Sequence, residues 1–339
     1  MNFALNEEQI ALQDAVHNFF ETKSTSEIIR KAMHEHAGFE ASLYESMCGE
    51  MGLTSLIVTE EYGGFGASDI ELNLAIEEHG YYLVPSPLRV HSFATILLQE
   101  CANDEAKTKF LPLLAEGSQI ATVAFEDFDQ VLFADIAKHL FFVKEKKLYY
   151  LDLEQDSVEI VKQKSIDPTQ HICRIEFNLN NAQEISDCDI GDSYKVAKSR
   201  MTILLANEML GASRRLFDMS LQYSKEREQF GKAIASFQII KHMLSDMYVE
   251  LEKVSSICLY GAYLSSEKDQ ELDIVAAMSK YQITKVFTSI AKDTIQIHGG
   301  IGFTYEHDAH LYLKRAAFSA YELGSKSEHC EAIAEAIFS

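Results

Sequence analysis

Proline and glycine are scarce in this chain of 339 residues, which contains 4 prolines and 16 glycines. Both residues interrupt regular secondary structure, so their scarcity favours long helices over many short strands joined by turns. Apolar residues make up 47% of the sequence, which suffices for a sizeable core and excludes wholesale disorder. Because the chain is too long for one ordinary core, we expect two or three domains.

Basic residues are also few, with 30 lysines and arginines against 52 aspartates and glutamates, giving a formal net charge of −22. An acidic field of this size repels nucleic acid and anionic lipid, so we expect neither as a partner. A ligand that carries phosphates needs a local basic group to bind against this field.

The sequence also lacks a C-x-x-C pair, a leader and a long apolar run. The widely scattered cysteines indicate reduced thiols in a cytoplasmic protein rather than a disulfide framework. The N-terminus, M-N-F-A-L-N-E-E-Q-I, has neither a basic nor an apolar leader region, so we expect no signal peptide and no membrane insertion. The cysteines are Cys48, Cys101, Cys173, Cys188, Cys258 and Cys330.

Residues 1–118 are predicted to form a helical domain. Asn6, followed by two glutamates, is a good helix N-cap, and an apolar stripe is expected at Ile10, Ala11, Ala15 and Phe19. T-E-E-Y-G-G-F-G, at positions 59–66, interrupts the helical pattern with a glycine loop, and P-S-P separates two later helices.

Residues 119–196 differ from the helical segment in their residue pattern, which predicts a small antiparallel β domain. Short runs such as L-F-F-V, L-Y-Y-L-D-L and V-E-I-V are rich in strand-forming residues and are separated by polar turns. Residues 197–339 return to helical periodicity and predict a helical bundle. Its clearest seam, with apolar residues at alternating steps of three and four, is Phe237, Ile240, Leu244, Met247, Leu251, Val254 and Cys258.

A glycine-rich stretch, I-Q-I-H-G-G-I-G-F at positions 295–303, admits three interpretations. A dinucleotide-binding loop follows a strand, whereas here the preceding segment carries lysines at helical spacing, and G-G-x-G matches neither a Rossmann nor a Walker pattern. An esterase oxyanion loop requires a G-x-S-x-G nucleophile elbow, which the sequence lacks. The third interpretation is a helix that ends in a glycine turn.

Several motifs occur together at consistent separations. They are S-K-E-R-E-Q-F-G at 224–231, the Phe-Gln pair that opens the seam helix, Q-I-H-G-G-I-G at 296–302, and the earlier T-E-E-Y-G-G-F-G loop. Their combination resembles the acyl-CoA dehydrogenase family over essentially the whole chain. The resemblance implies a mainly α fold with a small β domain: an N-terminal helical domain, a middle antiparallel β domain and a C-terminal four-helix bundle.

The family binds FAD at a subunit interface and oxidises acyl-CoA thioesters to 2-enoyl-CoA, with an electron-transfer flavoprotein as the implied acceptor. The resemblance assigns six residues to the ADP half of a neighbouring subunit's FAD. An arginine offers a planar, permanently charged fork to a pyrophosphate, and glycines let backbone N–H groups approach a ligand closely. The six are Arg227, Phe230, Gln238, Gln296, Gly299 and Gly300.

The catalytic base of the family is a carboxylate, and its position is altered here. Many relatives carry it in a Tyr-Glu-Gly sequence past the glycine loop, and an ungapped alignment places Leu323 there. Glu322 is the neighbouring residue and is our candidate base, although one residue on a helix is about 100° of rotation. Other members place the base on the first bundle helix, where positions 200–202 hold no carboxylate. Glu208 lies further along that helix and is expected to be a structural or interface residue.

The stretch that holds the flavin ring in relatives, Thr-Glu-Pro-x-Ala/Gly-Gly-Ser-Asp, is not recognisable. The corresponding segment reads A-T-V-A-F-E-D-F-D-Q-V-L-F, at positions 121–133. Residues that reach another subunit's FAD are thus kept, whereas residues that hold the chain's own flavin ring are changed.

Two functional hypotheses follow. The chain is a FAD-dependent acyl-CoA dehydrogenase acting as a homodimer or tetramer, or it is a catalytically silent subunit that clamps FAD for a longer homologous partner. The second resembles the short subunit of heteromeric bacterial α2β2 enzymes, which are associated with CoA thioesters of bulky groups such as steroid side chains. An unrelated helical-bundle binding protein would require the motif combination to be coincidental.

Other polar residues are expected to be structural. His307 and His310 lie three residues apart with Asp308 between them, but no further ligand cluster accompanies them, so we expect no metal. His298 is expected to cap or pack locally. Two pairs of adjacent acidic residues are expected to diverge in a loop or to form a solvated helix face, namely Glu60 with Glu61, and Glu77 with Glu78.

Overall fold

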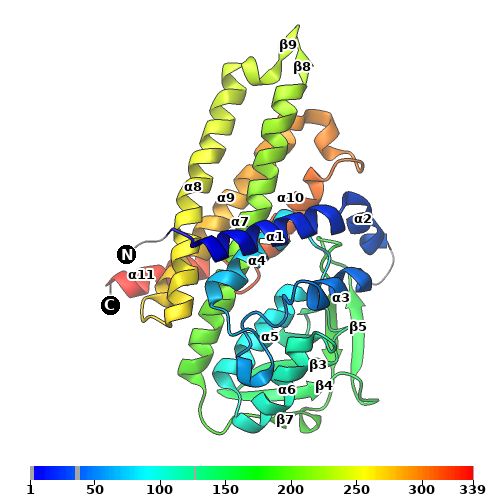
Figure 1. Ribbon diagram of the computed structural model, residues 1–339, viewed down its shortest axis with the longest axis vertical. Helices are drawn as coiled ribbons and strands as arrows, with labels where there is room; N and C mark the ends of the chain where they lie inside the picture. The colour runs from blue at the N-terminus through cyan, green and yellow to red at the C-terminus, as the bar shows by residue number, and fades with distance from the viewer. Residues whose placement is uncertain (1–3, 35–38, 126, 339) are drawn as a thin grey trace.

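The computed structural model describes residues 4–34, 39–125 and 127–338. Three long helices run along the longest axis of the molecule, and the strands and several of the N-terminal helices lie beside one end of them (Figure 1). Residues 1–3 of the N-terminal segment, and Glu126 of the altered flavin segment, lie outside the described residues.

The N-terminal part is helical, as predicted. Its helices are α1 (Glu7–Lys23), α2 (Ser26–His34), α3 (Ala41–Gly49), α4 (Asp69–Tyr81), α5 (Leu88–Cys101) and α6 (Asp104–Glu116), with a 3-10 turn, η1, at Glu60–Tyr62. The predicted cap is confirmed, because the side chain of Asn6 accepts a hydrogen bond from the backbone N–H of Gln9 at 2.8 Å.

The apolar stripe predicted for α1 is wrong in its register. Ile10, Ala11 and Ala15 are exposed, and α1 buries Val16 and Phe20 together with the predicted Phe19. The reason is that α1 contacts α4 partly through polar side chains: Gln9 and Gln13 donate hydrogen bonds to Glu71 and Glu78 of α4. A helix face that pairs with buried carboxylates does not follow an apolar pattern.

Helices α4 and α7 (Gly191–Glu226) cross at very short range. A Cβ added at Gly80 would lie 1.9 Å from the carbonyl oxygen of Glu208, and one at Gly211 would lie 1.8 Å from that of Glu77. Only hydrogen in place of a side chain permits this approach. The crossing brings α4 and its acidic residues directly against the bundle.

The middle part contains two small sheets. One has the strand order β1 (Ala121–Ala124), β3 (His139–Lys144), β4 (Lys147–Asp152) and β7 (Gln183–Glu184), and the other has β2 (Val131–Leu132), β6 (Ile172–Glu176) and β5 (Glu159–Gln163). Most pairs are antiparallel as predicted, but β1 pairs with β3 in parallel. The difference arises because the chain leaves the first sheet after β1, contributes β2 to the second sheet, and returns as β3.

The C-terminal part is a helical bundle. After α7 come the hairpin β8 (Glu228–Gln229) and β9 (Lys232–Ala233), a 3-10 turn at Ile234–Ser236, and the helices α8 (Gln238–Glu267), α9 (Leu272–His298), α10 (Ala309–Ser319) and α11 (Lys326–Phe338). The predicted seam of α8 is confirmed from Leu244 to Cys258, where all five apolar positions are buried. The ends of the three domains predicted above stay a prediction.

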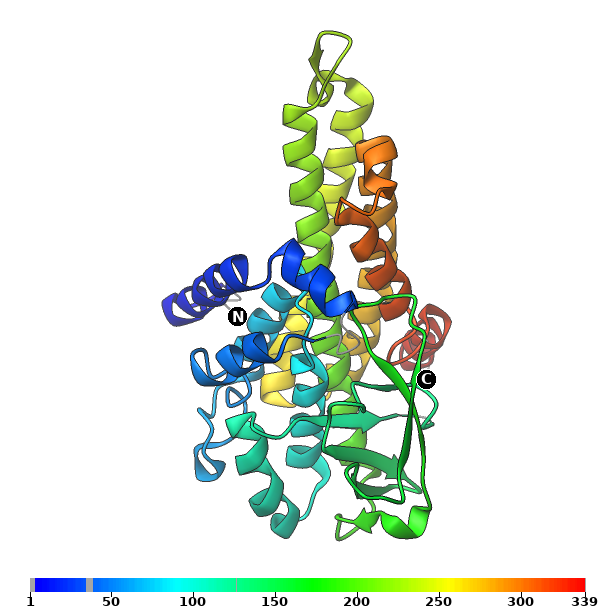
Figure 2. The same cartoon turned by 90° about the vertical axis from the view of Figure 1, so that its right-hand side faces the viewer.

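The hairpin β8–β9 projects from the end of the bundle that lies farthest from the two sheets (Figures 1 and 2). Among the described residues, no helix combines the length and the apolar character required to cross a bilayer.

Candidate nucleotide-binding surface and buried ion-pair network

The glycine-rich stretch ends a helix and forms a turn, as the third interpretation predicted. Helix α9 ends at His298, Gly299 adopts φ +60°, and a 3-10 turn, η4, runs over Gly299–Phe303. His298 packs locally, as expected: its Nδ1 atom lies 2.8 Å from the carbonyl oxygen of Thr294.

Two distant parts of the sequence meet beside this turn. The ring of His298 stacks on that of Tyr223, with centroids 4.4 Å apart, and its centroid also lies 4.4 Å from that of His307. Tyr223 is in the last turn of α7, directly before the β8–β9 hairpin, so the glycine turn and the S-K-E-R-E-Q-F-G segment are neighbours. A cavity of about 470 Å³ lies here, lined in part by Gln222, Glu226 and Arg215.

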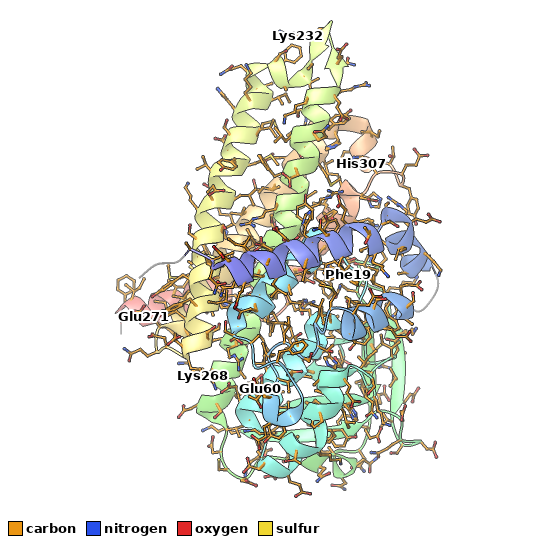
Figure 3. The ribbon with its side chains drawn as sticks, viewed as in Figure 1. Phe19, Glu60, Lys232, Lys268, Glu271 and His307 are labelled. Carbon is orange, nitrogen blue, oxygen red and sulfur yellow. The ribbon has the colours of Figure 1, made fainter. Side chains whose placement is uncertain are left out.

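We call the six residues assigned by resemblance the tip cluster: Arg227, Phe230, Gln238, Gln296, Gly299 and Gly300. All six are exposed. Figure 3 shows Lys232 at the extreme end of the hairpin, and His307 on the loop that follows the glycine turn. The structure therefore displays the tip cluster on the surface, away from the chain's own core.

The ring of Phe230 is 92% exposed and its backbone has a positive φ of 54°. Among the described residues, its one ring contact is with Phe237, 6.1 Å away between centroids. An aromatic ring held in solvent by a turn is a feature of binding surfaces.

The glycines of the turn are open to an approaching ligand. A Cβ at Gly299 or Gly300 would meet no atom of the chain within 4 Å, and Gly300 has no positive φ that would require glycine. Gly300 is therefore explained neither by packing nor by backbone conformation. The N–H of Gly299 already donates to the carbonyl oxygens of Gln296 and Ile295, whereas the space around Gly300 is open. An open turn and an exposed arginine on the same end of the bundle suit a phosphate-bearing ligand, so Gly300 and Arg227 fit the ADP half of FAD.

Glu322, the candidate base, lies in a turn after α10, and its side chain is 9% exposed. Its carboxylate forms an ion pair with the guanidinium of Arg89 on α5. Leu323, the position that aligns with the family's base, has a positive φ of 57° and a buried side chain. The helix has already ended at Ser319, so helical rotation does not decide where Glu322 points.

Arg89 belongs to a larger buried ion-pair network. It also contacts Glu208 of α7, with Nε 2.9 Å from Oε2, and Glu208 in turn pairs with Arg315 of α10 at 3.3 Å. Arg315 contacts Asp167 at 2.5 Å, in the segment between β5 and β6. One network therefore joins the N-terminal helices, the β part and the bundle.

The pKa values within the network follow from its charges. Burial by itself raises the pKa of Glu208, but Arg89 and Arg315 outweigh burial and hold it well below its usual range. Burial lowers the pKa of Lys280 to about 8, although nearby Glu322 opposes this shift. Its ammonium donates to the carbonyl oxygen of Ser319 at 2.7 Å, at the end of α10.

The prediction that Glu77 and Glu78 form a solvated face is wrong, because both are buried. Glu77 forms an ion pair with Arg214 of α7, and Glu78 lies 2.7 Å from Nδ1 of His17 on α1. These partners come from helices that pack on either side of α4, which the sequence of α4 itself does not reveal.

The remaining acidic and histidine candidates lie outside this ion-pair network. Glu60 and Glu61 are exposed in the η1 turn. Asp308 pairs with Arg30 of α2 at 2.5 Å. Within the described residues, no group of three or more histidines, cysteines, aspartates and glutamates is arranged to hold a metal ion.

Sequence reasoning did not identify Arg89, Asp167 or Arg315. Arg89 is separated from Glu322 by 233 positions, and Arg315 from Asp167 by 148. The one available signal was an arginine within the apolar run of α5, L-R-V-H-S-F, where a charge requires a buried partner.

The fold is shared with solved structures. The structure superposes on a variant of the Tcur3481-Tcur3483 steroid ACAD with a TM-score of 0.88 at 22% identity, covering 98% of each chain. It matches the ChsE4-ChsE5 complex of Mycobacterium tuberculosis with a TM-score of 0.88 at 18% identity, covering 99% of each chain. At these identities the likeness establishes the fold.

Sequence comparison establishes the family. Residues 6–118 match the acyl-CoA dehydrogenase N-terminal domain, and residues 195–338 match the acyl-CoA dehydrogenase C-terminal domain. The chain is 30% identical over 334 residues to the acyl-CoA dehydrogenase IpdE2 of Mycolicibacterium smegmatis, covering 98% of this chain and 100% of the relative. The chain therefore belongs to the acyl-CoA dehydrogenase family, whose members are flavin-dependent oxidoreductases that generally bind FAD.

Proposed function

We propose that this chain is the short subunit of a heteromeric acyl-CoA dehydrogenase, which converts an acyl-CoA thioester to its 2-enoyl-CoA. In this assembly the tip cluster clamps the ADP half of a FAD whose flavin ring is held by a longer homologous subunit. The observation that carries the proposal is the ion pair that Glu322 forms with the buried Arg89. An electron-transfer flavoprotein is the proposed acceptor.

The ion pair bears on the chemistry because the reaction removes an α-proton. A carboxylate base for this step works best in a dry site that raises its pKa towards the operating pH. A guanidinium stays charged at all accessible pH values and stabilises the ionised, weakly basic form of a carboxylate. Glu322 also lines none of the three cavities described for the chain, of about 470, 290 and 70 Å³.

The tip cluster supplies the chemistry of a nucleotide clamp. Arg227 would pair with the pyrophosphate, Gln296 would donate an amide hydrogen bond, and Phe230 would cover apolar surface of the nucleotide. When bound, FAD supplies the hydride acceptor of the reaction. The chain's own contribution is to bind and orient the nucleotide half from outside the flavin site.

Names of similar proteins support a two-subunit assembly. The Tcur3481-Tcur3483 and ChsE4-ChsE5 structures each carry the names of two gene products. A steroid group is named for the first of them, and we propose a bulky acyl-CoA of this kind as the substrate class. The six cysteines are free thiols, which agrees with a reducing, cytoplasmic environment.

One observation favours a second candidate, a homo-oligomer in which Glu322 acts as the base. Its Oε2 atom is buried and has no hydrogen-bond partner. A base needs such an unoccupied lone pair, so the two candidates predict different results for the same variants.

The first test is the flavin content of the chain. Purified alone, it should retain little FAD and show little dehydrogenase activity with an artificial acceptor, because the residues that hold a flavin ring are altered. Co-expressed with the longer homologous subunit, it should yield a yellow, active complex. Absorbance gives the ratio of FAD to protein, and a yellow, active homodimer would refute the proposal.

Glu322→Gln separates the two candidates within the assembled enzyme. If Glu322 only pairs with Arg89, kcat should stay within about twofold of the wild type, whereas loss of a general base costs roughly 10²–10⁴-fold. Thermal denaturation of the complex controls for lost stability. A fall of that size in kcat, with an unchanged melting temperature, would identify Glu322 as the base.

A side chain at Gly300 tests the clamp without disturbing the fold. Gly300→Val should leave the melting temperature of the lone chain unchanged, because a Cβ there meets nothing within 4 Å. In the assembled enzyme it should weaken FAD retention by about tenfold or more, equivalent to roughly 1.4 kcal/mol. Gly49→Val is the matched control, since Gly49 is equally open but lies on α3. Equal FAD retention in both variants would contradict the assignment of Gly300.

A further inference from the structure

A second groove lies on the bundle, outside the tip cluster. Its volume is about 290 Å³, and it is formed where α1 crosses the bundle (Figure 1). Residues of α1, α4, α7 and α8 line it: His17, Glu77, Glu78, Tyr81, Arg214, Phe217, Asp218, Tyr248, Leu251 and Glu252.

The groove is acidic. It contains four carboxylates and one guanidinium, and that guanidinium, Arg214, is engaged by Glu77 and by Ser255 at 2.7 Å. Burial raises the pKa of Glu77 to about 7, with Arg214 opposing this shift. Glu78 lies 2.7 Å from Nδ1 of His17. Asp218 accepts a hydrogen bond from the hydroxyl of Tyr81 at 2.9 Å. Glu252 is exposed, and it forms no ion pair with any other described residue.

Aromatic rings line the same groove. Phe217 and Tyr248 pack with ring centroids 5.8 Å apart, and Tyr248 is half-exposed. The ring of Tyr81 already forms a cation–π contact with the guanidinium of Arg215, which lies 5.4 Å from the ring centroid. Carboxylates beside aromatic faces bind guanidinium groups by ion pairing and cation–π attraction, so the groove has the chemistry to receive another.

The groove and one residue of the tip cluster, Gln238, lie on the same helix, α8. Tyr248 and Glu252 follow Gln238 by ten and fourteen positions, which on a helix is about 15–21 Å. Exposed apolar residues extend along this helix, with Ile239 66% and Val249 48% exposed. A surface that combines apolar residues with an acidic groove has the composition of a protein interface with a basic partner.

We infer that this groove receives an arginine side chain of the subunit whose FAD the tip cluster clamps. The inference rests on the proposed function, because it takes the partner from there. A second copy of this chain fits poorly, since a symmetric contact through the groove places two acidic surfaces together in a chain of net charge −22. The groove therefore selects a longer, different subunit over self-association.

Glu252→Lys tests this inference. The side chain is exposed and unpaired, so the lone chain should keep its circular dichroism spectrum and melting temperature. The Kd for binding to the longer subunit, measured by titration calorimetry at low salt, should rise about tenfold or more. The Kd should also depend less steeply on salt concentration. Glu267→Lys is the matched control, with the same charge change on an exposed position of α8 outside the groove, and should stay within about twofold.

Tyr248→Ala is a second variant that leaves the charge unchanged and should weaken association with little effect on the salt dependence. The inference is overturned if the complex forms and retains FAD while both groove variants associate like the wild type. It is also overturned if the lone chain self-associates and Glu252→Lys abolishes that dimer, because the occupant is then a second copy. Failure of the proposed function gives a different result, namely a lone chain that is yellow and active.

Discussion

Replacing Arg315 with methionine should lower the free energy of unfolding by about 3–5 kcal/mol, the usual consequence of removing one partner from a buried ion pair. Arg315 is 1% exposed and donates to Asp167 and, at 2.7 Å, to the hydroxyl of Thr169, while also contacting Glu208. Its loss leaves two buried carboxylates without this counter-charge. Urea denaturation of the lone chain measures the change.

The free energy of unfolding of the Arg315→Met variant should also depend differently on pH in the acidic range. Because the folded pKa of Glu208 lies below the unfolded value of 4.5, its contribution is fully present above pH 4.5 and is lost as the pH falls below that value. Without Arg315 this pKa moves upward, so the variant should be less stable at neutral pH and lose less stability on acidification.

Lys253→Met is the control for this experiment. Lys253 is exposed and pairs with Glu250 on the same helix at 2.7 Å, a contact that contributes only a few tenths of a kcal/mol. If both variants unfold at the same urea concentration, the network is not a source of stability. The ion-pair network would then act by positioning the side chain of Glu322.

Replacing Arg227 with alanine should weaken FAD retention of the assembled enzyme roughly 10–150-fold, corresponding to a charged hydrogen bond of about 1.5–3 kcal/mol. Arg227 is exposed at the end of α7 and forms no ion pair with another described residue, so its removal should not destabilise the lone chain. Equilibrium dialysis of FAD from the complex measures retention.

Two further variants sharpen this test. Arg227→Lys keeps the charge but loses the planar fork, and should give an intermediate loss. Arg174→Ala removes an exposed arginine on β6, far along the chain from the tip cluster, and should leave retention unchanged. If Arg227→Ala retains FAD as well as Arg174→Ala does, Arg227 is not part of a nucleotide clamp.

Local patterns in the sequence predicted much of the fold. The cap at Asn6, the seam of α8 and the glycine turn after His298 each depend on residues within a few positions of one another, and the structure confirms all three. The stripe of α1 was misplaced because Gln9 and Gln13 face α4, where they bond to carboxylates. A polar interface between helices has no apolar period to detect.

Among the candidate sites, too, short motifs predicted some residues, and contacts between distant segments decided the surroundings of others. The tip cluster came from motif resemblance, and its role as a clamp stays a prediction, but the stacking of His298 on Tyr223 shows that the end of α9 contacts the end of α7. Neither Glu77 nor Glu78 could be recognised as buried from α4 alone, because Arg214 and His17 belong to other helices.

The sequence by itself therefore determined the helical and β regions, the family and the residues of the tip cluster, since each is encoded in short segments. Only the tertiary structure decided the surroundings of Glu322. An ion pair between residues 233 positions apart depends on how three parts of the chain pack together, and no local pattern records it. The physical reason is that burial makes a charge require a partner but does not specify where in the sequence that partner lies.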